Sequence, residues 1–289
     1  MRSRESIAWS GCRSNDGGPV PSSRRALVVA SALPTRYGPY PFPPNSGIIP
    51  AAMDRPTLIL DADDTLWENN VFYEEAVDAF AERMAQEGFD PAEAREVFDR
   101  IEHERVVKVG YAPSEFARCM VITYRHLCQR YGRTARPEVE AEVETIGRRV
   151  IGYPIILLEG VKETIPHLHR RFRLILLTKG DPEVQHDKVA HSGLAPYFEA
   201  VHVVPEKGPE VLEELIERHG LDRRRTWMVG NSPRSDINPA LQVGIGAIHI
   251  PYKKPWAFEE APFVDPDRVV RLRRFSELPN LFPDTEEKK

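Results

Sequence analysis

The sequence predicts an α/β fold, with a mostly parallel sheet that has helices on both faces. Two observations support this prediction. After residue 154, short apolar runs alternate with helical patterns, which is typical of repeated βα units. Before it, residues 68–153 carry helical periodicity and almost no strand signal, which indicates a helical insertion after the first strand. We expect the sheet and its helices to comprise residues 53–67 and 154–283.

The first strand leads directly into a cluster of acidic residues. Residues 57–60 are apolar or β-branched, as in a strand buried on both faces, and Asp61 follows them. Open parallel sheets bind ligands beyond the carboxyl ends of their strands, so Asp61 should face that crevice. Because an extended chain repeats its facing every second residue, Asp63 should return to the same pocket while Ala62 points away.

Two carboxylates in one pocket suggest phosphoryl transfer. Their repulsion must be offset by a divalent cation or by a proton on one of them. One carboxylate could attack phosphorus, and the other could give a proton to the leaving oxygen and later take one from water. The alternative for residues 61–65, Asp-Ala-Asp-Asp-Thr, is a polar turn and helix cap, because Asp and Thr favour both places.

Composition excludes several classes of partner. The chain has 289 residues, a net charge of -5 and a pI near 6.0, so it has no basic footprint for nucleic acid. An apolar run at residues 26–33 is too short to span a membrane. The three cysteines, Cys12, Cys119 and Cys128, lack metal-ligand spacing and fit a reducing compartment. We expect a cytoplasmic protein with no nucleic-acid or membrane partner.

Residues 1–52 differ from the rest of the chain. They hold eight of its 26 prolines and have little hydrophobic periodicity, which predicts a disordered arm. Arg24-Arg25 and the apolar segment that follows could be interpreted as a targeting signal, but this segment is short and lies far from the first residue. We hypothesise that the natural product starts at Met53 and that the preceding residues are upstream sequence read in frame.

Hydrophobic periodicity and residues typical of helix starts predict where the individual elements lie. In the insertion, Val77, Phe80 and Met84 form one helical stripe, Asp90-Pro91 opens a second helix, Ser114 a third and Pro137 a fourth. Further helices are predicted at 159–170, 181–191, 208–219 and 236–243, strands at 173–177, 200–204, 226–229 and 246–250, and an edge strand at 269–272.

The next two strand ends carry groups suited to phosphate. Thr178, Lys179 and Gly180 follow one strand, where a hydroxyl and freed backbone N–H groups could cradle phosphate oxygens. Lys207 lies just after the following strand, where its ammonium could pair with the carboxylates and the phosphoryl group. Taken singly, a Thr that ends a strand and a solvated surface Lys are the commoner interpretations.

A third strand end adds oxygen ligands. Asn231 and Asp236 follow strand 226–229, and together with Asp61 and Asp63 they could hold Mg²⁺. Asp236 could instead, or in addition, cap the helix that follows.

Several other charged residues are predicted to be solvated. Lys188 is interpreted as a surface residue. Glu102, His103, Arg105 and Lys108 could line the inner surface of the helical insertion, but a solvated helical face is favoured for them.

Taken together, these strand ends resemble the four motifs of the haloacid dehalogenase superfamily. The resemblance rests on Asp61-x-Asp63-x-Thr65, Thr178, Lys207 and Gly230-Asn231-x(4)-Asp236, in that order, and extends from about 57 to 250. It implies a Rossmann-like core with a helical cap at 68–153. It also implies a Mg²⁺-dependent phosphatase that acts on small phosphorylated metabolites.

The resemblance also implies roles for individual residues. Asp61 would be the nucleophile and Asp63 the general acid and base, while Thr178 and Lys207 would hold the phosphoryl group. Two positions depart from the usual pattern. Asp64 replaces a common Gly and adds a charge near the mouth of the site. Asn231 stands where a metal-binding Asp is usual, which predicts weaker metal affinity unless Asp236 coordinates directly.

Three alternatives remain open. A metal-free dehalogenase of the same superfamily would use the first Asp on carbon, but it would lack the second, so Asp63 argues against it. A phosphosugar mutase would use the same residues as a phosphatase. A non-catalytic binding protein on the same fold is also possible, with Asn231 as its best support.

Overall fold

The structure is a computed structural model that describes residues 55–282. The predicted disordered arm at 1–52 and the proposed start at Met53 lie outside the described residues. Each element below is given with the bounds that the structure shows.

The described strands form one six-stranded sheet in which all pairings are parallel. Its order, β3-β2-β1-β4-β5-β6, is that of a Rossmann fold, and the sequence-based prediction of the fold class is confirmed. The order reverses between β1 and β4, which is where such sheets bind ligands. The strands are β1 (Thr57–Leu60), β2 (Arg173–Lys179), β3 (Ala200–Val204), β4 (Thr226–Gly230), β5 (Gly246–His249) and β6 (Val269–Arg271).

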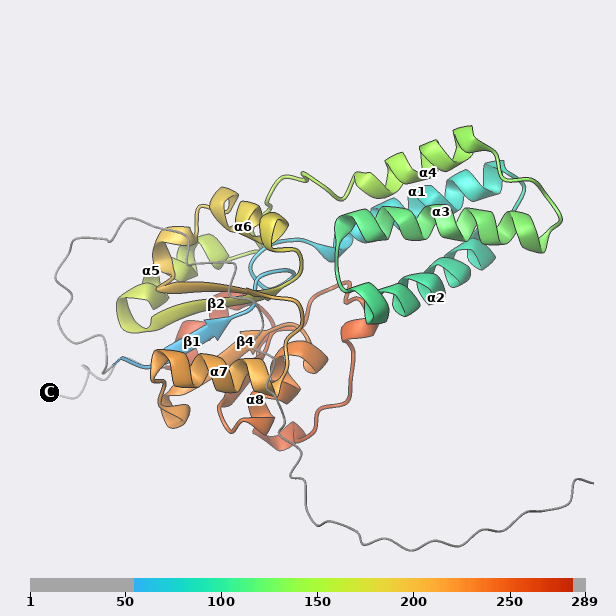
Figure 1. Cartoon of the computed structure of the whole chain (residues 1–289). Coiled ribbons are helices and arrows are strands. Elements are labelled where there is room, and N and C mark those ends of the chain that lie inside the picture. Colours follow the sequence, from blue (N-terminus) through green and yellow to red (C-terminus); the bar gives the residue numbers. More distant parts are fainter. Residues whose placement is uncertain (1–54, 283–289) are drawn as a thin grey trace, which may run out of the picture. The chain divides into compact units, whose positions relative to one another are not determined.

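Helices cover both faces of the sheet (Figure 1). Leu58 and Leu60 of β1 pack in one hydrophobic cluster with α5 and α6, whereas Ile59 packs in another with α7 and α8. This alternation follows from the two-residue period of a strand, so β1 is apolar on both sides. The helices are α5 (Val161–Arg171), α6 (Pro182–His191), α7 (Pro209–His219) and α8 (Asn238–Gln242).

The insertion between β1 and β2 is helical and has its own apolar core. Phe80, Phe98, Met120 and Leu127 are fully buried within it. The Asp90 side chain accepts the Ala92 N–H at the start of the second helix, as Asp-Pro predicts. The four helices are α1 (Asn70–Gln86), α2 (Pro91–Val109), α3 (Pro113–Arg130) and α4 (Pro137–Arg148). Over residues 55–282, no helix combines the length and apolarity needed to cross a bilayer.

Several elements differ from their predicted bounds by one or two residues, and two of the differences lie at the site. Strand β2 continues through Thr178 and Lys179 instead of ending at 177. The helix predicted at 236–243 begins as a π-helical turn at Pro233–Ile237 and becomes α-helical only at Asn238. The wider turn shifts the chain so that the Asn238 N–H bonds the carbonyl of Pro233. π-Helical turns are rare and frequently occur at functional sites.

Candidate active site

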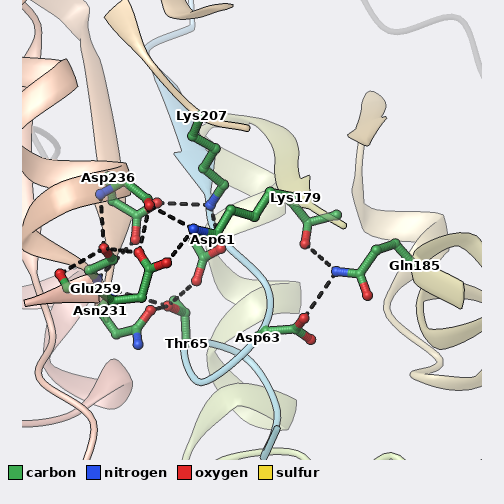
Figure 2. Close-up of polar contacts among 12 residues, drawn as sticks. Asp61, Asp63, Thr65, Lys179, Gln185, Lys207, Asn231, Asp236 and Glu259 are labelled. Atoms are coloured by element: carbon green, nitrogen blue, oxygen red, sulfur yellow. Dashed lines mark hydrogen bonds and ion pairs between the residues drawn. The ribbon is translucent and has the colours of Figure 1, made fainter. Parts of the chain in front are cut away.

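Asp61 lies at the carboxyl end of β1 and is almost fully buried. Its backbone N–H donates to Val229 of β4, and its side chain is only 8% exposed. The Lys207 ammonium donates to Oδ1, and the Thr65 hydroxyl donates to Oδ2 at 2.6 Å. Each oxygen of the carboxylate therefore has its own donor (Figure 2).

Lys207 joins Asp61 to Asp236. Its Nζ lies 2.8 Å from Asp236 Oδ1, and the Lys207 and Asp236 side chains are 2% and 1% exposed. Burial alone lowers the pKa of an ammonium, but the charges of Asp236 and Asp61 raise the pKa of Lys207 above its usual value. Burial raises the pKa of Asp61 to about 7, although the charge of Lys207 opposes this shift. Lys207 thus pairs with Asp61, as predicted, but its second carboxylate is Asp236, whereas Asp63 pairs with Lys188.

Asp236 does not cap the following helix through its own side chain. The Ser232 hydroxyl takes that place and accepts the Ser235 N–H at 2.8 Å. Asp236 instead lies within the π-helical turn that follows Ser232, and its Oδ2 accepts the Ser232 N–H at 3.0 Å. The suggested N-cap role is thus corrected, and Oδ1 of Asp236 faces Lys207.

Asn231 reaches the Asp61 carboxylate through Thr65. The Asn231 N–H donates to Thr65 Oγ1 at 3.1 Å, and Asn231 Oδ1 lies 3.2 Å from the same hydroxyl oxygen. Thr65 therefore connects the end of β4 to the end of β1. The side chains of Asp61, Asn231 and Asp236 present carboxylate and amide oxygens in one small region, as the order of the strand ends predicts.

Asp63 has a different set of partners from Asp61. Its carboxylate accepts from Trp67 Nε1 at 2.7 Å, from Gln185 Nε2 at 3.0 Å and from Lys188 Nζ at 2.9 Å. Its side chain is 23% exposed, and it lines the same cavity as Asp61. The prediction that Lys188 is a solvated surface residue is wrong, because its side chain is 19% exposed and its ammonium is paired.

The segment after β2 departs in part from the predicted phosphate cradle. Thr178 is 1% exposed and lines the cavity, and its hydroxyl oxygen accepts from Gln185 at 2.6 Å. The Gly180 N–H, however, donates to the Val204 carbonyl at 3.0 Å. This N–H extends the pairing of β2 with β3, so we correct the prediction that it is freed for a phosphate oxygen.

The Lys179 ammonium is also engaged elsewhere. It pairs with Glu259 and contacts the Ser235 hydroxyl at 2.9 Å and the Tyr111 hydroxyl at 3.0 Å. Glu259 in turn accepts hydrogen bonds from Ser232 and Ser235. The Lys179 side chain therefore ties the segment between α2 and α3 to the loop after β5; Figure 2 shows its pairing with Glu259.

Asp64 is buried rather than displayed at the mouth of the site. Its backbone has a φ of 63°, which L residues rarely adopt and which explains why Gly suits this position. Its carboxylate accepts the N–H groups of Asn69 and Asn70 at the start of α1. Burial raises the pKa of Asp64 to about 8 in spite of these hydrogen bonds. Asp64 thus lines the cavity, close to the site as predicted, but as a buried group that holds the start of α1.

A cavity of about 630 Å³ adjoins these residues. Strand ends and the segments that follow them supply one part of its lining, and α1, α2, α3, α6 and the loop after β5 also contribute. Glu102 and Arg105 line it and are only partly exposed, which corrects their assignment to a solvated face, whereas His103, which also borders the cavity, and Lys108 are exposed as predicted. Burial raises the pKa of Glu102 to about 8, so this side chain holds its proton at neutral pH.

The donor set partly fits a hard cation. Within residues 55–282, no three His, Cys, Asp or Glu side chains are grouped as a metal site. Asp61 and Asp236 both contact Lys207, and Asn231 lies beside Thr65, so these three residues bring oxygen donors of the kind that Mg²⁺ prefers. The Asp63 carboxylate stands apart from this group, because its partners, which come from α6 and Trp67, are not shared with Asp61, Asn231 or Asp236.

The strand order and the buried carboxylate at the end of central strand β1 define an α/β protein with its site at the switch point of the sheet. A model of the haloacid dehalogenase-like hydrolases matches residues 56–244, more than half of the chain. The chain belongs to the haloacid dehalogenase-like hydrolase family.

Three known proteins illustrate the similarity. N-acylneuraminate-9-phosphatase of Mus musculus is 29% identical over 98 residues, which are 32% of this chain and 40% of that protein. Phosphoserine phosphatase of Thermus thermophilus is 30% identical over 86 residues, 28% of this chain and 34% of that protein. The chain thus matches less than half the length of these relatives. The crystal structure of a haloacid dehalogenase-like hydrolase from Xanthomonas campestris has a TM-score of 0.65 at 25% identity, covering 78% of this chain and 90% of that one.

Proposed function

We propose that the protein hydrolyses a small phosphate monoester through an aspartyl-phosphate on Asp61. The observation that carries this proposal is the Asp61 carboxylate, which is buried at the end of β1 between Lys207 and Thr65 and lines a cavity. A buried, oriented carboxylate beside a cation is suited to attack on phosphorus, because Lys207 offsets the negative charge that phosphate brings. The similarity to two phosphatases supports the same chemistry.

The reaction has two steps. In the first, an oxygen of Asp61 bonds to phosphorus, the ester P–O bond breaks, and Asp63 gives its proton to the leaving oxygen. In the second, Asp63 takes a proton from water, the water oxygen bonds to phosphorus, and the Asp61–phosphorus bond breaks to release inorganic phosphate. Asp63 is suited to both transfers because it lines the cavity two residues from the nucleophile.

Two further side chains hold the phosphoryl group in this proposal. Lys207 and Thr178 are buried at the ends of neighbouring elements and both line the cavity. The Lys207 ammonium would bind a phosphoryl oxygen while it remains near Asp61. The Thr178 hydroxyl uses its oxygen to accept from Gln185, which leaves its proton for a phosphoryl oxygen.

We also propose that the activity depends on Mg²⁺. Asp61, Asn231 and Asp236 would hold the ion, and its charge would shield the phosphate from the carboxylates. Asn231 contributes a neutral amide oxygen, so we retain the prediction of modest metal affinity. The proposed ligand set omits the Asp63 side chain, because that carboxylate shares no partner with the other three residues.

The helical insertion at 68–153 would act as a cap that selects the substrate. Residues of α2 and α3 line the cavity, whose volume of about 630 Å³ suits a small phosphorylated metabolite. With Cys119 and Cys128 both free, a reducing, cytoplasmic location remains our prediction.

A phosphatase screen tests the proposal. Purified protein is offered p-nitrophenyl phosphate, sugar phosphates, nucleotides, phosphoglycolate and a 2-haloacid, with Mg²⁺ or with a chelator. We expect phosphate release that requires Mg²⁺ and no halide release. Halide release without metal would replace the proposal with a dehalogenase, and transfer of phosphate within one sugar would replace it with a mutase. Tight binding of a phosphorylated compound without turnover would favour a binding protein.

A further inference from the structure

The partners of Asp63 come mainly from one helix, α6. Gln185 and Lys188 are three residues apart and therefore share a face of that helix. Both reach the Asp63 carboxylate, with Gln185 Nε2 at 3.0 Å from Oδ2 and Lys188 Nζ at 2.9 Å from Oδ1. Two residues more than a hundred positions away in the sequence thus bind this carboxylate.

Gln185 links Asp63 to Thr178. Its amide nitrogen donates both to Asp63 and, at 2.6 Å, to the Thr178 hydroxyl oxygen (Figure 2). The Gln185 amide therefore turns its NH₂ group, which is its only donor, toward both acceptors. Gln185 is only 3% exposed. Its burial holds the amide in this orientation. Movement of Asp63 is therefore coupled to Thr178.

Lys188 links Asp63 to the start of the helical insertion. Its ammonium contacts both oxygens of Asp63 and donates to Asn69 Oδ1 at 2.8 Å. Asn69 immediately precedes α1. The ammonium thus bridges the Asp63 carboxylate and Asn69, the residue that leads into the insertion.

We propose that Gln185 and Lys188 are positioning residues that hold Asp63 where it serves the leaving oxygen. The inference rests on the proposed phosphatase function. Neither residue contacts the Asp61 carboxylate in this structure, where Lys207 and Thr65 supply its side-chain donors. Their removal should therefore weaken the proton transfers of Asp63 and spare the attack by Asp61.

The test compares substrates that differ in their need for a proton. A p-nitrophenolate leaves without protonation, whereas an alkoxide does not. We expect Lys188→Met to lower kcat/KM for the alkyl phosphate that the wild type hydrolyses best by roughly 10-fold or more, as displaced catalytic groups do. With p-nitrophenyl phosphate the loss in kcat/KM should stay below about 2-fold, because kcat/KM reports the first step alone, whereas kcat also includes the second step, in which Asp63 takes a proton from water. Gln185→Leu, which also removes a partner of Thr178, should likewise cause its larger loss with the alkyl phosphate. Lys162→Met, at an exposed lysine of α5, is the matched control.

Combination with Asp63→Asn separates positioning from a general structural role. If Lys188 acts through Asp63, adding Lys188→Met to Asp63→Asn should cause no further loss. Lys188→Arg, which keeps the charge, should recover part of the activity toward the alkyl phosphate. Equal losses on both substrates, additive losses in the double variant, or a Lys188→Met enzyme indistinguishable from Lys162→Met would overturn the inference. Absence of phosphatase activity in the wild type would instead overturn the proposed function.

Discussion

Asp61 and Asp63 are separated by one residue, yet they lie in two different environments. Asp61 is almost fully buried and is held by Lys207 and Thr65. Asp63 is partly exposed and is held by Trp67 and by two residues of α6. Two carboxylates at alternate positions of an extended chain can therefore face one cavity without sharing a single partner.

This difference suits the two tasks that we propose for these residues. A nucleophile benefits from a fixed, buried position, whereas a group that gives and takes protons needs contact with the leaving oxygen and with water. The structure keeps the two carboxylates from competing for one cation, because Lys207 pairs with Asp61 and Lys188 pairs with Asp63. The following predictions test whether this division holds.

Asp61→Asn should have the largest effect on activity. An amide is a poor nucleophile, so we expect a loss on the order of 10⁴-fold with every phosphate monoester, whatever its leaving group. Steady-state assays with p-nitrophenyl phosphate and an alkyl phosphate measure it. Asp78→Asn, at an exposed carboxylate of α1, is the control and should retain full activity. A variant at position 61 that keeps a tenth of the wild-type rate would refute the nucleophile assignment.

Lys207→Met should cause the largest loss of stability. It removes the only cation that contacts both Asp61 and Asp236 in the described structure, and it leaves two buried carboxylates that repel one another. Breaking a buried ion pair costs about 3–5 kcal/mol in the free energy of unfolding. Urea denaturation without Mg²⁺ measures the change, and Lys162→Met is again the matched control. A loss below about 1 kcal/mol would mean that the cluster does not depend on Lys207.

Asp63→Asn should have an effect that depends on the leaving group. An amide cannot donate the proton that an alkoxide needs, so hydrolysis of alkyl phosphates should slow by about 100-fold or more. Hydrolysis of p-nitrophenyl phosphate should slow far less, in contrast to Asp61→Asn. The measurement is the ratio of kcat/KM for the two substrates, which reports the first step alone, and equal losses would contradict the acid role of Asp63.

Asn231→Asp should have the smallest effect. A carboxylate in place of the amide adds a charged oxygen ligand, so we expect Mg²⁺ to bind about 10-fold more tightly. The Mg²⁺ concentration that gives half of the maximal rate reports this change, and the maximal rate itself should move little. Asn238→Asp, at a buried amide that bonds the segment near Pro262, controls for the added charge. If the Mg²⁺ concentration for half of the maximal rate were unchanged or higher in Asn231→Asp, residue 231 would not be a ligand of the ion.

The sequence predicts the fold and the ends of the strands because these follow from local patterns. Buried strands such as 57–60 and helix starts such as Asp90-Pro91 depend on neighbouring residues alone, and the parallel sheet brings their ends to one edge. The juxtaposition of Asp61, Lys207 and Asp236 follows from that rule, although they are far apart in the chain.

Side-chain partners outside the strand ends are not predictable in this way. The pairing of Lys188 with Asp63 depends on which face of α6 turns toward β1, and the burial of Glu102 depends on how α2 packs. The three-residue spacing of Gln185 and Lys188, soon after Thr178, is a signal that could have found this pair. The burial of Asp64 against the start of α1 was not predictable either, because it depends on a positive φ that the sequence pattern does not reveal.

The phosphorylated residue itself tests the central claim most directly. Protein is quenched with acid during turnover of a phosphate monoester in the presence of Mg²⁺, digested, and analysed by tandem mass spectrometry. We predict an acid-stable phosphoryl group on the peptide of β1, located at Asp61 and absent from Asp61→Asn. A phosphoryl group located at Asp63 or at any other residue would contradict the account.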